Sequence, residues 1–337
     1  MSDAASTRAQ SADARRAALV YNPIKVDRRR LRAQVTHFAK LAGWRHPLFF
    51  ETTPDDLGDG ATARALEAGV DAMLVAGGDG TVRAVAHALA GRGVPLSIVP
   101  SGTGNLLARN LFLPLDDPEK MIRATFEGEL RTIDVGLARI VRADGSTTEQ
   151  GFVVMAGMGL DAAMIANTRP ELKKAVGWVA YVDGAARSLA GAKPFRLVYQ
   201  IDDHRLHTSK VHSMLVANCG ALPAGIALIP DASVTDGILD VAVIQPTGWF
   251  GWIGVWRKVW WDNSVLRRFR AGRRVLERRG RDTSVHFRRG HRVEIATSPA
   301  QPVELDGDEF GEAVEMTSRV QAGALQVFVP AGHRTLP

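Results

Sequence analysis

The sequence predicts two domains, a doubly wound α/β domain followed by a predominantly β domain that forms a sandwich. Three observations predict this. In the first 130 residues, short apolar runs alternate with stretches of helical spacing, which is typical of a parallel sheet covered by helices. Two of these runs end in glycine-rich turns, 24 residues apart from Gly78 to Gly102. From Thr132 onward, strand patterns predominate.

The composition is that of a soluble globular protein. The chain has 337 residues, of which 46% are hydrophobic and 23% charged, so two domains with sizeable cores are expected. A single cysteine, Cys219, excludes an internal disulfide and suits a reducing compartment. Residues 1–16 are polar, and we expect a disordered tail there. No stretch approaches the roughly 18–20 apolar residues that cross a bilayer. We therefore expect a cytoplasmic protein.

The elements of the first domain follow from hydrophobic spacing. Period-2 or continuous apolar runs predict strands, and apolar residues three to four apart predict helices. The expected strands are 19–21, 47–50, 72–76 and 97–100, and the expected helices are 31–41, 61–68, 82–89, 106–111 and 118–127.

The first glycine turn joins a buried strand to a helix. It reads Gly77-Gly78-Asp79-Gly80-Thr81 and opens the helix that begins at Val82. Glycines let backbone N–H groups approach an anion, and a helix N-terminus favours negative charge. Asp79 among phosphates indicates a divalent cation beside it. A glycine-rich turn with a helix-capping Asp or Thr is the alternative.

A second turn of the same kind follows strand 97–100. It contains Gly102, Thr103, Gly104 and Asn105 and opens the next helix. Both turns are expected at the carboxyl edge of one parallel sheet, where they would form a polyphosphate cradle. Arg109, one helical turn further on, is a candidate phosphate partner, with a solvated surface charge as the alternative.

The second domain is expected to consist mainly of strands. Helices near 171–190 and 249–279 interrupt them. His204, His207 and His212 fall in strand-like sequence, and we interpret them as surface histidines in preference to a zinc site. The expected strands are 133–136, 152–155, 196–201, 211–217, 238–244, 292–296 and 325–329.

The segment 249–281 combines tryptophan with positive charge. Residues 257–281 hold ten Lys or Arg against two acidic residues, and five of the seven tryptophans lie between 249 and 261. Such a segment fits an anionic membrane surface. A tryptophan-rich helix packed on its own domain, with a solvated basic face, is an equal alternative. No nucleic-acid reader motif accompanies the charge, so nucleic acid is not an expected partner. A homodimer stays open.

The set of motifs resembles the bacterial diacylglycerol kinase family, which is similar also to sphingosine and ceramide kinases and is related through its nucleotide domain to NAD kinases. The resemblance implies ATP in a cleft between the domains and a last strand that returns to the first. By that resemblance the domains are 17–134 with 311–337, and 135–310. The motifs are Asn22-Pro23, Glu51-Thr52-Thr53, the two glycine turns, Ile133-Asp134-Val135-Gly136, Thr235-Asp236-Gly237-Ile238-Leu239-Asp240 and Glu304-Leu305-Asp306-Gly307-Asp308.

The resemblance also implies roles for individual residues. Asp306 and Asp308 resemble the family's carboxylate pair, whose second member is the general base. Asp236, with the carbonyls of Ser233 and Ile238, resembles a structural magnesium site, and Asp134 resembles an acidic residue near the catalytic metal. Together with the turn residues and Arg109 named above, the expected ATP contacts are Asn22, Pro23, Lys25, Thr52, Gly77, Gly78, Asp79, Gly80, Thr81, Val82, Arg83, Gly102, Thr103, Gly104 and Asn105.

Elementary chemistry agrees with this pair of carboxylates. A hydroxyl that attacks a phosphate must lose its proton, and a placed carboxylate contributes about 10²–10⁴-fold. In one strand, Asp306 and Asp308 would share a face. A solvated acidic hairpin turn is the alternative for Asp306-Gly307-Asp308, and a turn is likewise the alternative for Asp236-Gly237.

The sequence departs from the family pattern at several positions. Asp308 stands where the family has Glu, so neighbouring Glu309 is a second candidate base. Arg83-Ala84 replaces Asn-Glu, and Leu106 replaces a carboxylate of the proposed metal network. Lys25 stands in a loop that elsewhere has Ser-Gly, and it can serve there as a point charge.

The expected function is an ATP- and Mg²⁺-dependent lipid kinase that phosphorylates a primary hydroxyl, that of diacylglycerol first, at the inner face of the membrane. Two alternatives remain. One is a kinase of NAD or another soluble alcohol, and the other is a nucleotide-regulated lipid-binding protein whose active site has decayed.

Overall fold

The computed structural model describes residues 14–159, 194–222, 226–227, 229, 232–245 and 285–333. The chain divides into two compact units, residues 1–135 with 322–337 and residues 136–321. The helices expected near 171–190 and 249–279, and the basic tryptophan-rich segment 249–281, lie outside the described residues, as does the expected tail up to residue 13.

The first unit is an α/β domain built on a parallel sheet. Strands β1 (Ala17–Tyr21), β2 (Leu48–Glu51), β3 (Ala72–Gly77) and β4 (Leu96–Pro100) lie in the order β4-β3-β1-β2. The end of β16 (Asp308–Val329) pairs with β4 in parallel through Val327 and Leu96. This confirms the doubly wound fold class predicted from the alternating pattern.

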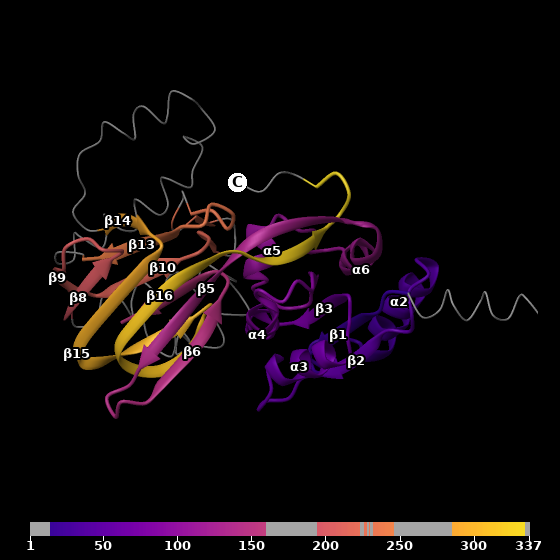
Figure 1. Ribbon diagram of the computed structural model, residues 1–337, viewed down its shortest axis with the longest axis horizontal. Coiled ribbons are helices and arrows are strands. Elements are labelled where there is room, and N and C mark those ends of the chain that lie inside the picture. Colours follow the sequence, from indigo (N-terminus) through magenta and orange to yellow (C-terminus); the bar gives the residue numbers. More distant parts are fainter. Residues whose placement is uncertain are drawn as a thin grey trace, which may run out of the picture. The chain divides into compact units, whose positions relative to one another are not determined.

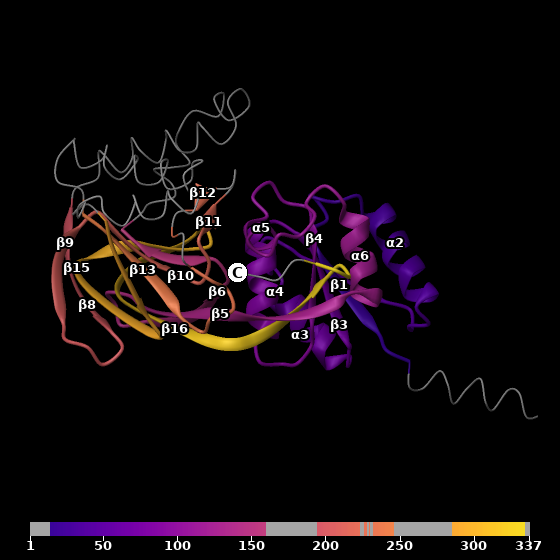
Figure 2. The same ribbon diagram turned by 90° about the horizontal axis from the view of Figure 1, so that it is seen from above.

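Helices cover both faces of this sheet (Figures 1 and 2). Helix α2 packs on α6, and α3 packs on α4. In both views α3 and α4 lie on one side of β1 and β3, while α2 and α6 lie on the other. The helices are α2 (Arg28–Leu41), α3 (Asp59–Glu67), α4 (Asp79–Leu89), α5 (Leu106–Asn110) and α6 (Pro118–Glu127).

Local signals explain the helix boundaries. The carboxylate of Asp27 accepts a hydrogen bond from the Arg30 N–H at 3.1 Å, so α2 begins at Arg28, three residues before its first apolar position. Asp117 caps α6 in the same way, and Pro118 occupies the first helical position. The apolar faces meet alternate residues of β1 and β3 in one core cluster that includes Leu19, Val35, Phe38, Leu74 and Ile122.

The second unit is a sandwich of antiparallel strands. One layer runs β14-β13-β10-β7 and then pairs with the end of β15. The start of β15 pairs instead with β8 and β16, after which β5 and β6 follow. The strands are β5 (Glu129–Val141), β6 (Thr147–Phe152), β7 (Met155–Met158), β8 (Phe195–Ile201), β9 (His207–Val211), β10 (Ser213–Ala217), β13 (Leu239–Ile244), β14 (Val285–Gly290) and β15 (Arg292–Leu305), with a separate pair β11 (Ala221–Leu222) and β12 (Ile226–Ala227).

Alternating side chains from these strands form the core of the second unit. Residues 214 and 216 of β10 and residues 239, 241 and 243 of β13 are buried in one cluster. Residues 197, 199 and 201 of β8 enter the same cluster, so the period-2 pattern fixes which face of each strand is inside. This confirms the predicted β-sandwich.

Two strand predictions need correction. The strand expected at 152–155 is broken, because β6 ends at Phe152 and β7 begins at Met155. The strand expected at 325–329 is the end of a much longer strand that starts at Asp308. Among the described residues, none of the helices has the length and apolar character needed to cross a membrane.

Candidate active site

The candidate nucleotide site of the first unit lies at the carboxyl edge of its parallel sheet. Asn22 follows β1, Thr52 follows β2, Gly78 follows β3, and Ser101 follows β4. The N–H of Asn22 donates to the carbonyl of Ala76, and the N–H of Thr52 donates to the carbonyl of Tyr21. Parallel pairing thus gathers the predicted ATP-contact segments at one edge, which is where such sheets bind ligands.

The first glycine turn opens α4. Gly77 ends β3, and Gly78 occupies the N-cap position of a helix that starts at Asp79. Glycine brings no side chain to cap this terminus. The first-turn N–H groups of an α-helix have no carbonyl partner within the helix, and this makes such a terminus an anion-binding site.

The second glycine turn packs directly on the first. A Cβ on Gly102 would lie 3.1 Å from the Cα of Gly78 and 3.2 Å from the carbonyl oxygen of Gly77. A Cβ on Gly104 would collide with the carboxylate of Asp79. With glycine at both positions the two turns approach this closely without displacing backbone atoms or the Asp79 carboxylate. The structure therefore brings together the two loops whose sequences predicted a phosphate cradle.

Asp79 joins the two turns. Its Oδ1 accepts a hydrogen bond of 2.6 Å from the backbone N–H of Leu106, the first residue of α5. The amide of Asn105 closes the second turn, because its Oδ1 accepts from the Gly102 N–H at 3.0 Å and its Nδ2 donates to the Gly102 carbonyl at 2.9 Å. Asn105 itself has a φ of 47°. Both side chains shape the cradle.

Basic residues lie around these turns. The Lys25 Nζ lies 3.1 Å from the point that a Cβ would take on Gly78, so its charge is at the mouth of the first turn. The loop that carries Lys25 is ordered by Asn22, whose Oδ1 accepts from the Ile24 N–H at 3.0 Å. Arg109 donates from Nε to the Gly104 carbonyl at 2.6 Å, and Arg83 is buried in α4. Arg109 thus braces the second turn through its backbone.

Asp134 lies in the first unit, on β5. It is 2% exposed, and its Oδ1 accepts a 2.7 Å hydrogen bond from the Gly323 N–H of β16. The structure therefore places this carboxylate at the junction of two strands, in addition to any role that the resemblance gives it.

Asp306 and Asp308 lie at a hairpin in the second unit. Leu305 of β15 pairs with Asp308 of β16, so Asp306 and Gly307 form a two-residue turn. Their φ values are 53° and 89°, and two positive values are what a type I′ turn requires. The expectation that both aspartates share one face of a single strand is therefore wrong, because a chain reversal separates them.

The carboxylate of Asp306 binds three consecutive backbone amides. Its Oδ2 accepts from the Val153 N–H at 2.9 Å, and its Oδ1 accepts from the N–H groups of Val154 at 2.8 Å and Met155 at 2.9 Å. These contacts explain the break between β6 and β7, since the amides that would continue a ladder point to the carboxylate. Asp306 is 5% exposed, so it acts in this unit as a positioning residue.

Asn218 and Cys219 complete the same bend from the other side. The Asn218 side chain donates to the Val153 carbonyl at 3.1 Å, and the backbone N–H groups of both residues donate to the Val154 carbonyl. Cys219 is buried. Burial first, and then the nearby charge of Asp306, raise the pKa of its thiol well above the usual range. This thiol is therefore protonated and part of the core.

Asp308 and Glu309 differ in exposure. Asp308 is half-buried at the first position of β16, and Glu309 is exposed and pairs across the hairpin with Glu304. Asp308 is thus held at the turn, while the side chain of Glu309 extends into solvent.

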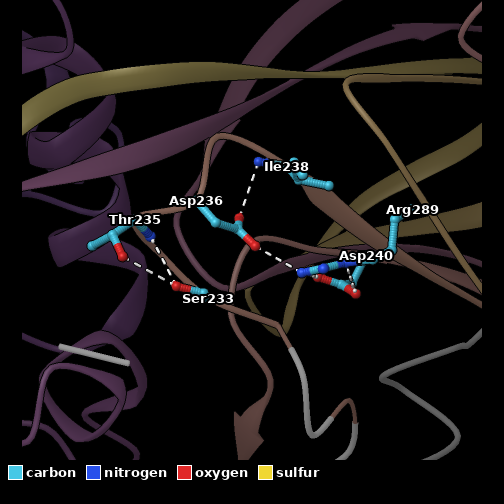
Figure 3. A network of polar contacts seen from close by, with 6 residues as sticks. All are labelled: Ser233, Thr235, Asp236, Ile238, Asp240 and Arg289. Atoms are coloured by element: carbon cyan, nitrogen blue, oxygen red, sulfur yellow. Dashed lines mark hydrogen bonds and ion pairs between the residues drawn. The ribbon is translucent and has the colours of Figure 1, made fainter.

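The predicted structural magnesium site contains an arginine (Figure 3). The Asp236 Oδ1 accepts from the Ile238 N–H at 3.1 Å, and its Oδ2 accepts from Arg289 at 2.7 Å. Arg289 also donates from Nε to Asp240 Oδ1 at 3.0 Å, and this hydrogen bond raises the pKa of the guanidinium. The Ser233 and Thr235 hydroxyls bond to each other at 3.1 Å. No group of three or more His, Cys, Asp or Glu that could hold a metal occurs in the described part of the chain.

Three groups that hold these loops in place were not predicted from the sequence: Asn218, Arg289 and the backbone N–H of Leu106. Asn218 lies 65 residues from its partner Val153, and Arg289 lies 53 residues from Asp236. The Leu106 amide exists whatever the side chain, so only the closeness of the two turns reveals it.

Comparison with known proteins bears on both units. A model of the diacylglycerol kinase catalytic domain matches residues 16–138, and a model of the YegS C-terminal NAD kinase beta sandwich-like domain matches residues 152–329. The second match alone covers more than half of the chain.

Individual relatives agree. A Pseudomonas aeruginosa protein named "Probable lipid kinase YegS-like" is 30% identical over 275 residues, 81% of each chain. A Mycobacterium tuberculosis protein named diacylglycerol kinase is 30% identical over 185 residues, 54% of this chain and 58% of that protein, so the chain matches little more than half of that relative's length.

The fold is shared with a solved structure. A crystal structure of a diacylglycerol kinase from Bacillus anthracis superposes with a TM-score of 0.62 at 18% identity, over 94% of this chain and 97% of that one. The α/β unit, the sandwich and both domain matches lead to one conclusion. The chain belongs to the lipid kinase family in which a diacylglycerol kinase catalytic domain is joined to a YegS-type β-sandwich domain.

Proposed function

We propose that this protein is an ATP- and Mg²⁺-dependent lipid kinase that transfers the γ-phosphate to the primary hydroxyl of diacylglycerol, giving phosphatidic acid at a membrane surface. The observation that supports it best is the direct packing of Gly102 on Gly78, which sets two helix-opening turns side by side at one sheet edge. Two related proteins carry the names lipid kinase and diacylglycerol kinase.

The residues of the first unit suit a triphosphate. The backbone N–H groups of the two turns would cradle the phosphate oxygens, and Lys25 would add a point charge at the mouth of the first turn. Asp79, in contact with both turns, would hold Mg²⁺. When bound, Mg²⁺ would neutralise the charge that develops on the transferred phosphoryl group.

The second unit would supply the base. Phosphoryl transfer needs a group that accepts the proton of the attacking hydroxyl. Asp308 is the candidate, because it directly follows the hairpin turn. The turn itself is held by the three hydrogen bonds that the Asp306 carboxylate accepts from backbone N–H groups. Glu309, exposed one position further on, provides a matched comparison.

The test is phosphorylation of a lipid panel, with products identified by mass spectrometry. The purified protein would receive radiolabelled ATP and Mg²⁺ with vesicles that carry diacylglycerol, ceramide or sphingosine, and in a separate arm NAD without lipid. We expect label in diacylglycerol. Asp308→Asn should lower the rate by about 10²–10⁴-fold, whereas Glu309→Gln should change it little.

Other outcomes are equally informative. If Glu309→Gln loses kinase activity and Asp308→Asn keeps it, the general base is Glu309 instead of Asp308. If only NAD becomes labelled, the substrate is a soluble alcohol and not a lipid. If the protein binds ATP and lipid but phosphorylates none of the acceptors, it is a lipid-binding protein without kinase activity. Equal rates in the wild type, Asp308→Asn and Asp79→Asn would exclude the proposed site.

A further inference from the structure

The loop before β13 combines two aspartates with an arginine from the neighbouring strand. Asp236 lies in this loop, Asp240 lies in β13, and Arg289 lies in β14. By family resemblance this loop is a structural magnesium site, with Asp236 as its side-chain ligand. A metal could organise this loop only if the carboxylate oxygens of Asp236 were accessible to it.

Arg289 binds both carboxylates at once (Figure 3). It contacts Asp236 Oδ2 at 2.7 Å, Asp240 Oδ1 at 3.0 Å and Asp240 Oδ2 at 3.3 Å. The register of the sheet places Asp240 and Arg289 directly opposite each other in antiparallel strands. The contact is therefore built into the pairing of β13 with β14.

The burial of Asp240 favours a positive charge beside the two carboxylates. The Asp240 side chain is 5% exposed, whereas those of Asp236 and Arg289 are 28% and 46% exposed. A buried carboxylate without a counter-charge strongly destabilises a fold. The planar guanidinium spans two carboxylates, which a lysine ammonium does less well.

A divalent ion fits poorly beside this arginine. Both oxygens of Asp236 already accept hydrogen bonds, one from the Ile238 N–H and the other from Arg289. Mg²⁺ at Asp236 Oδ2 would face the positive guanidinium and would need a near-complete octahedron of oxygens. If Arg289 moved away to admit the ion, Asp240 would lose both of its hydrogen bonds with the guanidinium.

We propose that Arg289 is the resident cation of this loop and takes the place of the structural metal, so that the order of residues 233–240 depends on a side chain instead of an ion. This inference concerns the stability of the second unit and holds whether or not the proposed kinase activity does.

Thermal unfolding of the full chain without nucleotide tests it, in EDTA and in millimolar Mg²⁺ or Ca²⁺. Wild-type Tm should be the same in all three buffers. Arg289→Met should lower the Tm in EDTA by roughly 5–10 °C, because the guanidinium that binds both Asp236 and Asp240 is lost. Arg289→Lys should fall between the two, and it serves as the readout if Arg289→Met does not fold.

Asp236→Asn in the wild-type background is the matched control for ions that bind elsewhere. A wild-type Tm that falls in EDTA and recovers with Mg²⁺, with the response lost in Asp236→Asn, would overturn the proposal. An Arg289→Met variant as stable as wild type in EDTA would also overturn it. A drop in Arg289→Met supports the proposal, and recovery of that drop by Mg²⁺ would show an ion entering the place that the arginine leaves.

Discussion

Asp306 illustrates how one side chain can organise a segment far away in sequence. Its carboxylate accepts hydrogen bonds from the N–H groups of Val153, Val154 and Met155, about 150 positions earlier in the chain. The same residue takes the first position of the hairpin turn that precedes Asp308. One aspartate thus holds the bend between β6 and β7 and the turn that carries the candidate base.

Replacement of Asp306 should therefore destabilise the protein more than replacement of its neighbours. Asp306→Ala removes the acceptor of three N–H donors, two of them buried and that of Met155 partly buried. A buried donor without an acceptor costs about 1–3 kcal/mol, so we expect a total of about 3 kcal/mol. Urea denaturation would measure it. Exposed Glu309→Gln is the control and should stay within about 0.5 kcal/mol of wild type. Equal stability of the two variants would contradict the role assigned to Asp306.

The sequence predicted some roles at this scale and could not predict others. An Asp-Gly pair between two strands is a hairpin signal, so the sequence itself indicates a turn at Asp306-Gly307 as one alternative. The arginine at the Asp236 loop was not predictable, because its contact depends on the register of β13 with β14. Contacts that arise only when distant strands pair leave no local pattern.

The two glycine turns are the elements on which the nucleotide proposal depends. The spacing of apolar runs predicted both of them, and parallel pairing of β3 with β4 brings their ends together. The distance between the two turns was not predictable from the spacing of apolar residues in the sequence. It is so small that backbone atoms of Gly77 and Gly78 lie 3.1–3.2 Å from the point where a side chain on Gly102 would start.

Gly102→Ala should consequently weaken ATP binding. The added methyl group meets backbone atoms that cannot move aside without separating the turns, so we expect at least a roughly tenfold rise in the Kd for a fluorescent ATP analogue. The control is Gly69→Ala, at a φ of 66° with open space around it, which should cost about 1 kcal/mol of stability without touching the turns. If both variants bind ATP like wild type, the turns are not the cradle.

Other elements show where periodicity succeeds and fails. Helix α2 begins three residues earlier than expected, because its first turn is arginine-rich and only the Asp27 cap marks the start. The strand expected at 152–155 was apolar throughout, yet Val153 and Val154 leave the ladder because Asp306 binds their amides. Apolar runs predict burial reliably, whereas a break caused by a distant carboxylate has no local signature.

The first unit consists of two separate stretches of the chain. Residues 1–135 supply four of its parallel strands, and residues 322–337 return to it. In that return Leu325, Val327 and Val329 are buried, and Val327 pairs with Leu96 of β4. The sheet is thus completed by the end of β16.

Val327→Ala should therefore lower the stability of the first unit. The change removes two buried methyl groups and leaves a cavity, which costs about 2 kcal/mol. Gln326→Ala, at the neighbouring exposed position of the same strand, should be nearly neutral. Backbone hydrogen exchange in β1, β3 and β4 would measure the loss in this unit, because six of the seven tryptophans lie in the second unit and would dominate the fluorescence. A Gln326 variant that loses more stability than the Val327 variant would contradict the packing.

The late return of β16 has a consequence for synthesis. While the ribosome is still making the chain, β4 has an open edge, and its neighbour emerges only after residues 136–321 have been translated. The sandwich can finish folding first, whereas the N-terminal part must wait with unpaired backbone groups that invite pairing with other nascent chains. Chaperone demand during translation should accordingly come from the part that is made first and closed last.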